Sequence, residues 1–426
     1  MSKKPSWEAA CNHSDTCALT GSAAFFMAVP GTSVLVNGPL WCYFYAMRYM
    51  ENAVGNLSDR MFCTQPAGTA VVYGTESDLL KGFETVQKTK MPERLFIENN
   101  CSISMIGDDL AGIAGRANLP FPVYTLDSGG IHGGFAGGWS RACLRAIEDM
   151  KAGETIPRSV NLLGMTPFLL KGREDMAEIR RLLGMCGISV VSIPGGDSAW
   201  DDIMKAPEAA LNIVTRDELG LKAAEAMKKQ FGIPYISVGL PYGLEGTKRW
   251  LSGVLSVLDG KLDAVEEEIK TRGGWMKRIG SDMESLWGPL WFDRILIAGG
   301  PSEVSGIAEA VRGEWADAET LTAQLQLPTE KEIPAADRIL TAGIDDAAIN
   351  EAYENWQGGL LMGSAHEASR LIRLRKHFLS CNIAYPSYME MFLTDVPFCG
   401  LRGAAFLYER LWNVRLQSRI KDRCEV

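Results

Sequence analysis

Short apolar runs alternate with longer amphipathic stretches along the whole chain. Apolar residues 34–36 precede a helix-like stretch at 40–52, and apolar residues 95–97 precede a helical pattern that begins near residue 101. Short apolar runs indicate buried strands, whereas apolar residues three to four positions apart indicate helices with one buried face. Strands that alternate with helices predict a parallel sheet covered by helices on both faces.

Two further segments of the first 150 residues follow the same pattern. Residues 70–86 predict a short strand at 71–73 followed by a helix whose first turn carries Thr75, Glu76 and Asp78. Hydroxyl and carboxylate side chains are favoured there because they pair with the free N–H groups at a helix N-terminus. Residues 122–147 predict a strand, a glycine-rich loop and a helix.

The alternation restarts twice further along the chain. Residues 157–193 and 209–238 predict strands separated by helices, and residues 247–270 predict one long helix. A third unit begins at the apolar run 295–298, and its polar stretch 316–335 predicts a surface loop or a frayed helix.

These units fit the length of the chain, since domains commonly have about 150 residues. We therefore predict an α/β protein of three Rossmann-like domains with parallel sheets flanked by helices, at residues 1–155, 156–288 and 289–426.

Composition and charge exclude several classes of partner. The formal net charge of −9 leaves no basic surplus to displace counterions from nucleic acid. The apolar stretches are too short to span a bilayer, and the lysine-containing N-terminus has no apolar core typical of a secretory signal. We therefore expect a cytoplasmic protein that binds neither nucleic acid nor a membrane.

The ten cysteines carry the main chemical signal. No Cys-x-x-Cys pair is present, which disfavours zinc ribbons and thioredoxin-type sites. Cys42 and Cys101 each follow a predicted strand, and Cys17 follows the polar residues 13–16 at the start of an element. Ligands of open α/β sheets bind outside the carboxyl ends of strands, where such cysteines can converge. Helix N-termini also stabilise thiolates, which are the ligands of iron–sulfur clusters.

Buried cysteines are more often core fillers than ligands, so the remaining cysteines need a separate interpretation. Cys63 lies before the predicted strand at 71–73 and is an additional candidate ligand. The others fall in predicted helices, loops or tails and are expected to be structural: Cys11, Cys143, Cys186, Cys381, Cys399 and Cys424.

A glycine-rich loop, SGGIHGGFAGGW (128–139), precedes a predicted helix, which is the usual context of a phosphate site. The strict G-x-G-x-x-G pattern is absent, so a close backbone approach to a cluster or subunit interface is the better interpretation. His132 is either a hydrogen-bonded loop histidine or a residue near the cluster. No GxxxxGK[ST] motif occurs, and we expect no ATP hydrolysis by this chain.

Several motifs together resemble the nitrogenase component 1 family. Cys17, GPLWC (38–42) and NNCSISMIGDDLAG (99–112) resemble its three-cysteine pattern, with intervals of 25 residues from 17 to 42 and 59 residues from 42 to 101. VVYGTESDLLKG, AALNIV, FGIPYISVG, LMGSAHE and PFCGLRGAAFL extend the resemblance over nearly the whole chain. The family also contains protochlorophyllide and chlorophyllide reductases and cofactor-assembly scaffolds.

The resemblance implies paired subunits that hold an iron–sulfur cluster between them. Cys17, Cys42 and Cys101 would be this chain's ligands, and the partner subunit would supply the rest. The cluster would be [4Fe–4S] or a larger P-cluster-like one. The implied partners are a homologous component 1 subunit, in a heterotetramer or homodimer, a P-loop ATP-dependent iron–sulfur reductase, and a small-molecule substrate.

Two departures from the family pattern limit the expected reaction. The catalytic nitrogenase subunit binds its iron–molybdenum cofactor with a cysteine that follows the segment aligned with NIV (212–214), where this chain has Thr215 and Arg216. Residues 385–396 lack the family's cofactor histidine. The resemblance therefore implies a reductase subunit acting on a substrate other than dinitrogen. The alternatives are a scaffold for assembly of a nitrogenase-type metal cofactor and a metal-free sugar- or nucleotide-binding protein.

Overall fold

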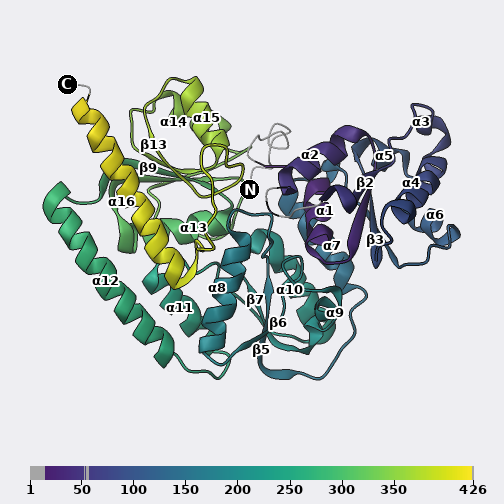
Figure 1. The fold of residues 1–426 in the computed structure, drawn as a ribbon, viewed down its shortest axis with the longest axis horizontal. Helices are drawn as coiled ribbons and strands as arrows, with labels where there is room; N and C mark the ends of the chain where they lie inside the picture. Colours follow the sequence, from purple (N-terminus) through teal and green to yellow (C-terminus); the bar gives the residue numbers. More distant parts are fainter. Residues whose placement is uncertain (1–14, 52, 54–56, 425–426) are drawn as a thin grey trace.

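Parallel β-sheets flanked by helices form the architecture of the chain (Figure 1). The computed structural model describes residues 15–51, 53 and 57–424. Within these residues there are three sheets, and every pair of neighbouring strands is parallel. The predicted fold class, three α/β units with flanking helices, is confirmed.

The first sheet has the strand order β2-β1-β3-β4. Its strands are β1 (Thr32–Asn37), β2 (Met61–Cys63), β3 (Arg94–Asn99) and β4 (Val123–Asp127). The helices of this part are α1 (Ala18–Ala28), α2 (Leu40–Met50), α3 (Ala70–Tyr73), α4 (Glu76–Thr89), α5 (Cys101–Ile106), α6 (Leu110–Arg116) and α7 (Phe135–Ile147). All residues of β1 and β3 are buried, as expected for central strands covered on both faces.

The strand predicted at 71–73 is wrong, because these residues belong to helix α3. The edge beside β1 is taken by β2, with Val36 opposite Cys63. Gly74, at φ 77°, ends α3 and leads into α4. Apolar content alone does not distinguish a short strand from a helical turn, and the sheet edge was already occupied.

Helices α1 and α7 approach each other closely through two glycines. A Cβ atom on Gly21 would lie 1.9 Å from the carbonyl oxygen of Phe135, and one on Gly138 would lie 1.8 Å from that of Ala18. Phe25 and Trp139 pack edge to face beside this contact, with ring centroids 5.3 Å apart. The glycines therefore set the distance between α1 and the helix that follows the glycine-rich loop.

The second sheet has the order β6-β5-β7-β8. Its strands are β5 (Ile156–Leu163), β6 (Ser189–Ser192), β7 (Ala209–Val214) and β8 (Tyr235–Ser237). Its helices are α8 (Gly172–Met185), α9 (Trp200–Met204), α10 (Asp217–Phe231), α11 (Leu244–Leu255) and α12 (Asp263–Trp287). The single long helix predicted at 247–270 is wrong: the segment is split between α11 and α12, with Asp259 and Gly260 in the break.

The third sheet has the order β11-β10-β9-β12-β13. Its strands are β9 (Trp291–Gly299), β10 (Asp317–Leu325), β11 (Arg338–Thr341), β12 (Leu360–Gly363) and β13 (Leu379–Asn382). Its helices are α13 (Pro301–Ala310), α14 (Asp346–Glu354), α15 (Ala365–Arg373) and α16 (Gly400–Cys424).

The polar stretch predicted as a loop or frayed helix contains strand β10 instead. This strand pairs with β9 on one side and β11 on the other. Leu321, Ala323 and Leu325 are buried, whereas Asp317 and Glu319 are exposed. The alternation of apolar residues is confined to the second half of the strand, so the charged first half concealed it.

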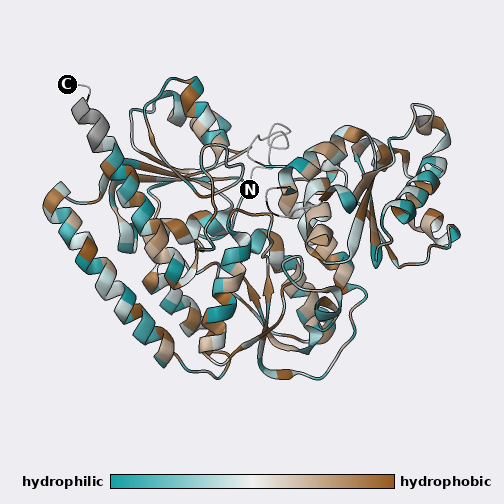
Figure 2. Ribbon diagram, in the orientation of Figure 1, coloured by the Kyte–Doolittle hydropathy of each residue, from teal (hydrophilic) through white to brown (hydrophobic). Residues whose placement is uncertain are grey.

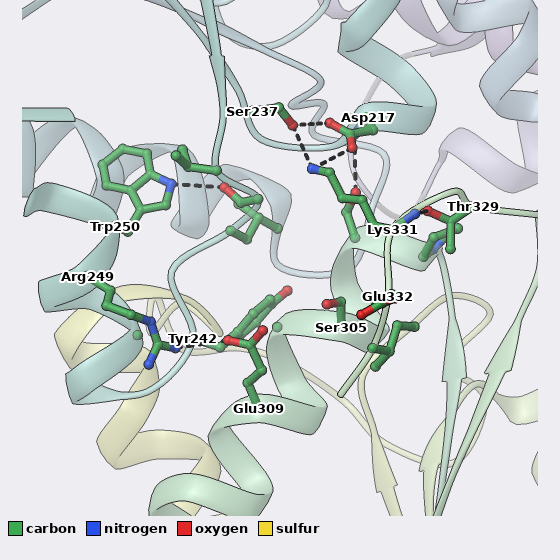
Figure 3. A pocket seen from close by; sticks show the side chains of 18 residues that line it. Asp217, Ser237, Tyr242, Arg249, Trp250, Ser305, Glu309, Thr329, Lys331 and Glu332 are labelled. Atoms are coloured by element: carbon green, nitrogen blue, oxygen red, sulfur yellow. Dashed lines mark hydrogen bonds and ion pairs between the residues drawn. The ribbon is translucent and has the colours of Figure 1, made fainter. Parts of the chain in front are cut away.

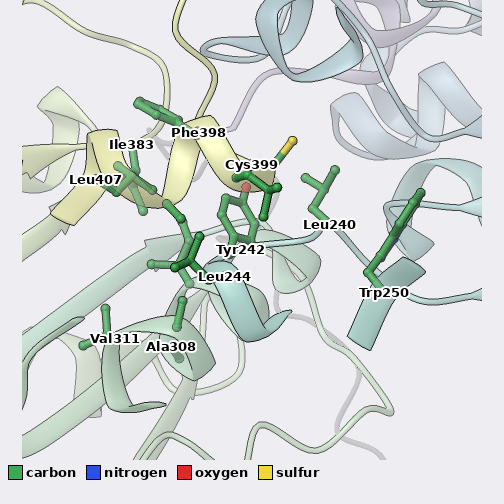
Figure 4. Close-up of a cluster of buried hydrophobic side chains, with 14 of the residues drawn as sticks. Leu240, Tyr242, Leu244, Trp250, Ala308, Val311, Ile383, Phe398, Cys399 and Leu407 are labelled. Atoms are coloured by element: carbon green, nitrogen blue, oxygen red, sulfur yellow. The ribbon is translucent and has the colours of Figure 1, made fainter. Parts of the chain in front are cut away.

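Apolar packing joins the three sheets into one body. The largest apolar cluster among the described residues spans the second and third sheets, and Figure 4 shows Leu244 of α11, Ala308 of α13 and Leu407 of α16 in it. A second cluster joins the first and second sheets through α1, α7 and α10. Figure 2 shows the strands mainly in apolar colours and α12 with many polar positions. None of the described helices is long and apolar enough to cross a membrane.

Candidate functional site

The three predicted ligand cysteines lie at the N-termini of three helices. Cys17 is the N-cap residue of α1, Cys42 lies in the first turn of α2, and Cys101 is the first residue of α5. Helix α2 follows β1 and α5 follows β3, which are neighbours in the first sheet. Because both strands are parallel, their carboxyl ends bring Cys42 and Cys101 to one edge.

Gly130, in the loop after β4, lies between Cys17 and Cys101. A Cβ atom on Gly130 would lie 3.1 Å from Cβ of Cys17 and 3.2 Å from Sγ of Cys101. The backbone N–H of Gly130 donates a hydrogen bond to Sγ of Cys101, at 3.0 Å. The structure therefore brings Cys17 and Cys101 together across one glycine, where a larger residue would crowd both side chains.

The loop that carries Gly130 is fixed to the start of α1. Ala18 N donates to Gly133 O at 2.8 Å, and Cys17 forms an isolated antiparallel bridge with Gly134. His132 lies on this loop, with Nε2 3.3 Å from a carboxylate oxygen of Asp127. The glycine-rich loop thus approaches the cysteines with its backbone, and His132 is hydrogen-bonded within the loop region.

Cys42 lies close enough to the other two thiols to interact with them electrostatically. Burial raises the pKa of the Cys42 thiol, and the neighbouring Cys17 and Cys101 raise it further. The side-chain amide of Asn100 donates towards Sγ of Cys42 at 3.7 Å and opposes this effect. A cation beside Cys42, such as the iron of a cluster, would favour its thiolate form.

The other cysteines divide by exposure. Cys63 ends β2, is half-buried and interacts electrostatically with Cys42, and burial raises the pKa of its thiol. Four cysteines are buried away from this edge: Cys143, Cys186, Cys381 and Cys399. Cys11 lies outside the described residues, and the side chain of Cys424 is not described.

The described residues contain no group of three or more histidine, cysteine, aspartate or glutamate side chains arranged for one metal ion. A cluster has a different requirement, because each cysteine binds a different iron and the sulfurs stand apart. Cys17 and Cys101 on either side of Gly130, with Cys42 in electrostatic contact with both, are compatible with this second requirement.

A buried carboxyl group lies on β3 beneath the cysteines. Ser22 and Ser128 each donate a hydrogen bond to Oε2 of Glu98, at 2.5 Å, and Oε1 has no partner among the described residues. Burial raises the pKa of Glu98 to about 8. Glu98 is therefore mostly protonated at neutral pH, which avoids an unpaired negative charge in the protein interior. Sequence reasoning missed this residue, because its strand reads as an apolar run.

Large apolar side chains are exposed on the elements that carry the cysteines and on elements near them in the chain. They belong to α2, α3, α5 and the turn at residues 130–132, and we call them the apolar face: Leu40, Trp41, Phe44, Tyr45, Val72, Tyr73, Met105 and Ile131. Trp41 is 65% and Tyr45 is 64% exposed, and their rings stack with centroids 6.1 Å apart. Soluble proteins rarely expose such groups together except where they bind another molecule.

A second polar centre lies where the three sheets meet. Arg216 follows β7, is 1% exposed, and forms an ion pair with Glu303 of α13, at 2.6 Å. Burial opposes the charge of Arg216, but Glu303, Tyr242 and Asp175 together outweigh this effect and raise the pKa of the guanidinium. The guanidinium also donates to the carbonyl oxygen of Gly164. The pair thus joins the second sheet to the third.

Only a small space remains beside this ion pair, and we call it the junction cavity. Its volume is about 60 Å³, and its lining includes Asp15, Tyr49 and Tyr385 as well as Arg216 and Glu303. Burial raises the pKa of Asp15 to about 6 and also raises the pKa of Tyr49. The sequence singled out Arg216 only as a departure from the family pattern, and its partner Glu303 was missed.

Known proteins with similar sequences belong to one group. Residues 17–415 match the family described as nitrogenase component 1 type oxidoreductase. The nitrogenase iron-molybdenum cofactor biosynthesis protein NifE of Clostridium pasteurianum is 30% identical over 261 residues, which cover 60% of this chain and 55% of that protein. A light-independent protochlorophyllide reductase subunit of Acidiphilium rubrum is 26% identical over 331 residues, covering 75% and 64%.

The matched regions thus span about half to two thirds of the length of these relatives. Among solved structures, one titled "Nitrogenase Cp1 at pH 6.5" superposes with a TM-score of 0.77 at 15% identity, covering 98% of this chain and 94% of that chain. This likeness shows a shared fold. Because the family match covers most of the sequence, the chain belongs to the nitrogenase component 1 type oxidoreductase family.

Proposed function

We propose that this chain is a subunit of a nitrogenase-like reductase that binds an iron–sulfur cluster at its interface with a homologous subunit. It would relay electrons from an ATP-dependent iron–sulfur reductase to a substrate other than dinitrogen. The observation that carries the proposal is the placement of Cys17 and Cys101 on either side of Gly130, with Cys42 beside them.

The residues at this edge fit a cluster better than a disulfide or a single ion. All three thiols are free, and they are half-buried or exposed at the surface that carries the apolar face. Cys17, Cys42 and Cys101 would be the ligands, and Cys63 is an additional candidate. When bound, the cluster, [4Fe–4S] or a larger P-cluster-like one, supplies one-electron transfer.

Other groups of this chain support the thiolates. The N–H of Gly130 donates to the Cys101 sulfur, and the three helix N-termini place partial positive charge beside the sulfurs. Asn100 donates towards Cys42. Such hydrogen bonds and dipoles favour the thiolate forms and tune the reduction potential of a bound cluster.

The apolar face supports a partner subunit. Four cysteine ligands are usual for a cubane, and three from this chain leave one to be supplied across an interface. Burying Trp41, Tyr45 and Tyr73 against a partner would also exclude water from the cluster, which the exposed Cys17 requires. A homologous subunit, in a homodimer or a heterotetramer, fits this requirement.

The alternative is a scaffold on which a nitrogenase-type metal cofactor is assembled, and the similarity to NifE favours it. The junction cavity argues against a large cofactor inside this chain. Its space of about 60 Å³ holds little more than a few water molecules, and the Arg216–Glu303 pair occupies its wall without a cysteine ligand. We therefore favour the reductase.

The first experiment tests the cluster. The chain is co-expressed with the proteins that its neighbouring genes encode and purified without oxygen. Iron, sulfide and the EPR spectrum of the reduced protein are then measured. Wild type is expected to contain both elements. Cys101→Ala and Cys42→Ala should lose most of the iron and the EPR signal, whereas Cys143→Ala, a buried cysteine in α7, should keep both. Iron-free wild-type protein would disprove the cluster.

A second experiment separates reductase from scaffold. The complex is mixed with its ATP-dependent reductase, and either a tetrapyrrole substrate or an apo-nitrogenase acceptor is added. ATP-dependent reduction of an organic substrate supports the reductase. Stoichiometric transfer of a metal cluster to the acceptor, without turnover, would instead show that the chain is an assembly scaffold.

A further inference from the structure

A second, larger cavity lies between the second and third sheets, away from the cysteines (Figure 3). Its volume is about 650 Å³, within the range of small-molecule sites. It is lined by residues that follow β7, β8, β9 and β10, and by residues of α11 and α13. Ligands of open α/β sheets bind outside the carboxyl ends of strands, which is where this space lies. We call it the polar cavity.

One end of the polar cavity carries a connected set of three side chains. Lys331 forms an ion pair with Asp217 at 2.6 Å and donates to the hydroxyl of Ser237 at 2.7 Å. Ser237 in turn donates to the Asp217 carboxylate. Figure 3 shows these groups gathered at one end. Both polar contacts of the Lys331 ammonium therefore lie within this set.

The other end carries a second ion pair and an aromatic wall. Arg249 pairs with Glu309 at 2.9 Å, across α11 and α13. Trp250 and Tyr242 line this end as largely buried rings, and the indole N–H of Trp250 donates to the carbonyl oxygen of Gly239. Between the two ends, Figure 3 shows Ser305 and Glu332, whose side chains have no hydrogen bond or ion pair among the described residues.

The charges of the lining restrict the kind of ligand. Both basic side chains are already paired with carboxylates, and Glu332 adds a third carboxylate without a basic partner among the described residues. The net negative charge of the lining would repel a phosphate or nucleotide, and no unpaired basic side chain among the described residues of the lining is left to bind it. A large apolar ring system would leave the charged groups without water. Hydroxyl groups fit better, because each one both donates and accepts hydrogen bonds.

We propose that the polar cavity binds a neutral, hydroxyl-rich small molecule with the size of a mono- or disaccharide. Its hydroxyls pair with Asp217 and Lys331 at one end and with Arg249 and Glu309 at the other. The proposal concerns a site separate from the cluster, and it holds whether or not the chain proves to be a reductase.

Gly246 of α11 offers a way to fill the cavity. It lines the space, and a Cβ atom added there would meet no atom within 4 Å. Gly246→Phe should therefore place a ring in the cavity without displacing its walls, and Gly246→Ala is the matched control. Lys331→Met removes one polar end, and Lys229→Met, an exposed lysine of α10 outside the cavity, is its control.

The test is isothermal titration of the full chain, in its purified complex, with glucose, maltose and myo-inositol, and with ATP and inorganic phosphate as charged comparisons. At least one sugar or polyol is expected to bind. Gly246→Phe should weaken that binding at least tenfold and Lys331→Met at least fivefold, whereas both controls should change it less than twofold. Cys101→Ala should leave it unchanged, which separates this result from that for the cluster.

The proposal is overturned if none of the three hydroxyl-rich probes binds, or if ATP or phosphate binds more tightly than all of them. Binding that survives both Gly246→Phe and Lys331→Met would also overturn it. Thermal unfolding of each variant shows whether it is folded. If Gly246→Phe does not fold, Lys331→Met and its control decide the outcome.

Discussion

Arg216 donates to Oε1 of Glu303 at 2.6 Å in the protein interior, and this contact joins residues 87 positions apart in the sequence. Arg216 occupies the region of the sequence where the catalytic subunit of nitrogenase, according to the family resemblance, has its cofactor cysteine. A buried charge that loses its partner is strongly destabilising, because the remaining ion is neither solvated nor paired. The contact therefore has a measurable role in stability as well as in limiting the junction cavity.

Arg216→Met should lower the free energy of unfolding by about 3–5 kcal/mol, because the Glu303 carboxylate, whose side chain is only 14% exposed, loses its cation. The measurement is denaturant unfolding followed by circular dichroism. Arg249→Met, in an ion pair whose arginine side chain is 66% exposed, should cost only about 0–1 kcal/mol. Adding Glu303→Leu to Arg216→Met should recover part of the loss. Equal stability of Arg216→Met and Arg249→Met would contradict the role of the buried pair.

Gly138→Ala should destabilise the contact between α1 and α7, because its new methyl group would lie 1.8 Å from the carbonyl oxygen of Ala18. Overpacking of this kind typically costs about 1–3 kcal/mol. Gly137→Ala is the matched control, since its Cβ would meet only the His132 carbonyl oxygen, at 3.5 Å. Thermal unfolding should show a lower midpoint for Gly138→Ala alone. Since Cys17 is the N-cap residue of α1, iron content should fall in the same variant.

Replacing Trp41 and Tyr45 together by serine should weaken assembly with the partner subunit without weakening the fold. Both side chains are exposed, and exposed substitutions usually change stability by less than about 0.5 kcal/mol. Size-exclusion chromatography of the complex should show dissociation at concentrations where wild type stays assembled. Trp275→Ser changes an exposed tryptophan on α12 and is the control. An intact complex in the double variant would exclude the apolar face as the interface.

Glu98→Gln should flatten the dependence of stability on pH. The pKa of Glu98 is about 8 in the folded chain, against an ordinary value of 4.5. As pH rises, the Glu98 carboxyl ionises first in the unfolded chain. The stability that its neutral form gives the folded chain is therefore fully present below pH 4.5 and is lost as pH rises towards 8. Within this window, one such group lowers the free energy of unfolding by at most about 1.4 kcal/mol for each pH unit.

The measurement for Glu98 is the free energy of unfolding at pH 6, 7 and 8. Wild type should lose more stability across this range than Glu98→Gln. Glu84→Gln, on the exposed surface of α4, should keep the wild-type slope. Burial also raises the pKa of Asp15, to about 6, and this contribution is the same in all three proteins. Identical slopes in wild type and Glu98→Gln would show that Glu98 does not titrate as proposed.

Local patterns in the chain were sufficient to predict most of the elements and the kind of fold. The apolar runs at 34–36 and 95–97 and the mainly apolar run at 209–214 all became strands, and the amphipathic stretches after them became helices. These patterns act over a few residues, since burial of one face is decided by spacing along the chain. The placement of Cys42 and Cys101 after two strands followed from the same local signals.

Long-range packing, in contrast, decided which segments form the edge strands of the sheets. It also decided which side chains distant in sequence contact each other. Residues 61–63 rather than 71–73 pair with β1, and the charged stretch at 317–325 becomes a strand because β9 and β11 both pair with it. Gly130 between Cys17 and Cys101, Arg216 against Glu303, and the protonated Glu98 likewise depend on residues distant in sequence. Their contacts and ionisation follow from packing and burial, which local periodicity does not encode.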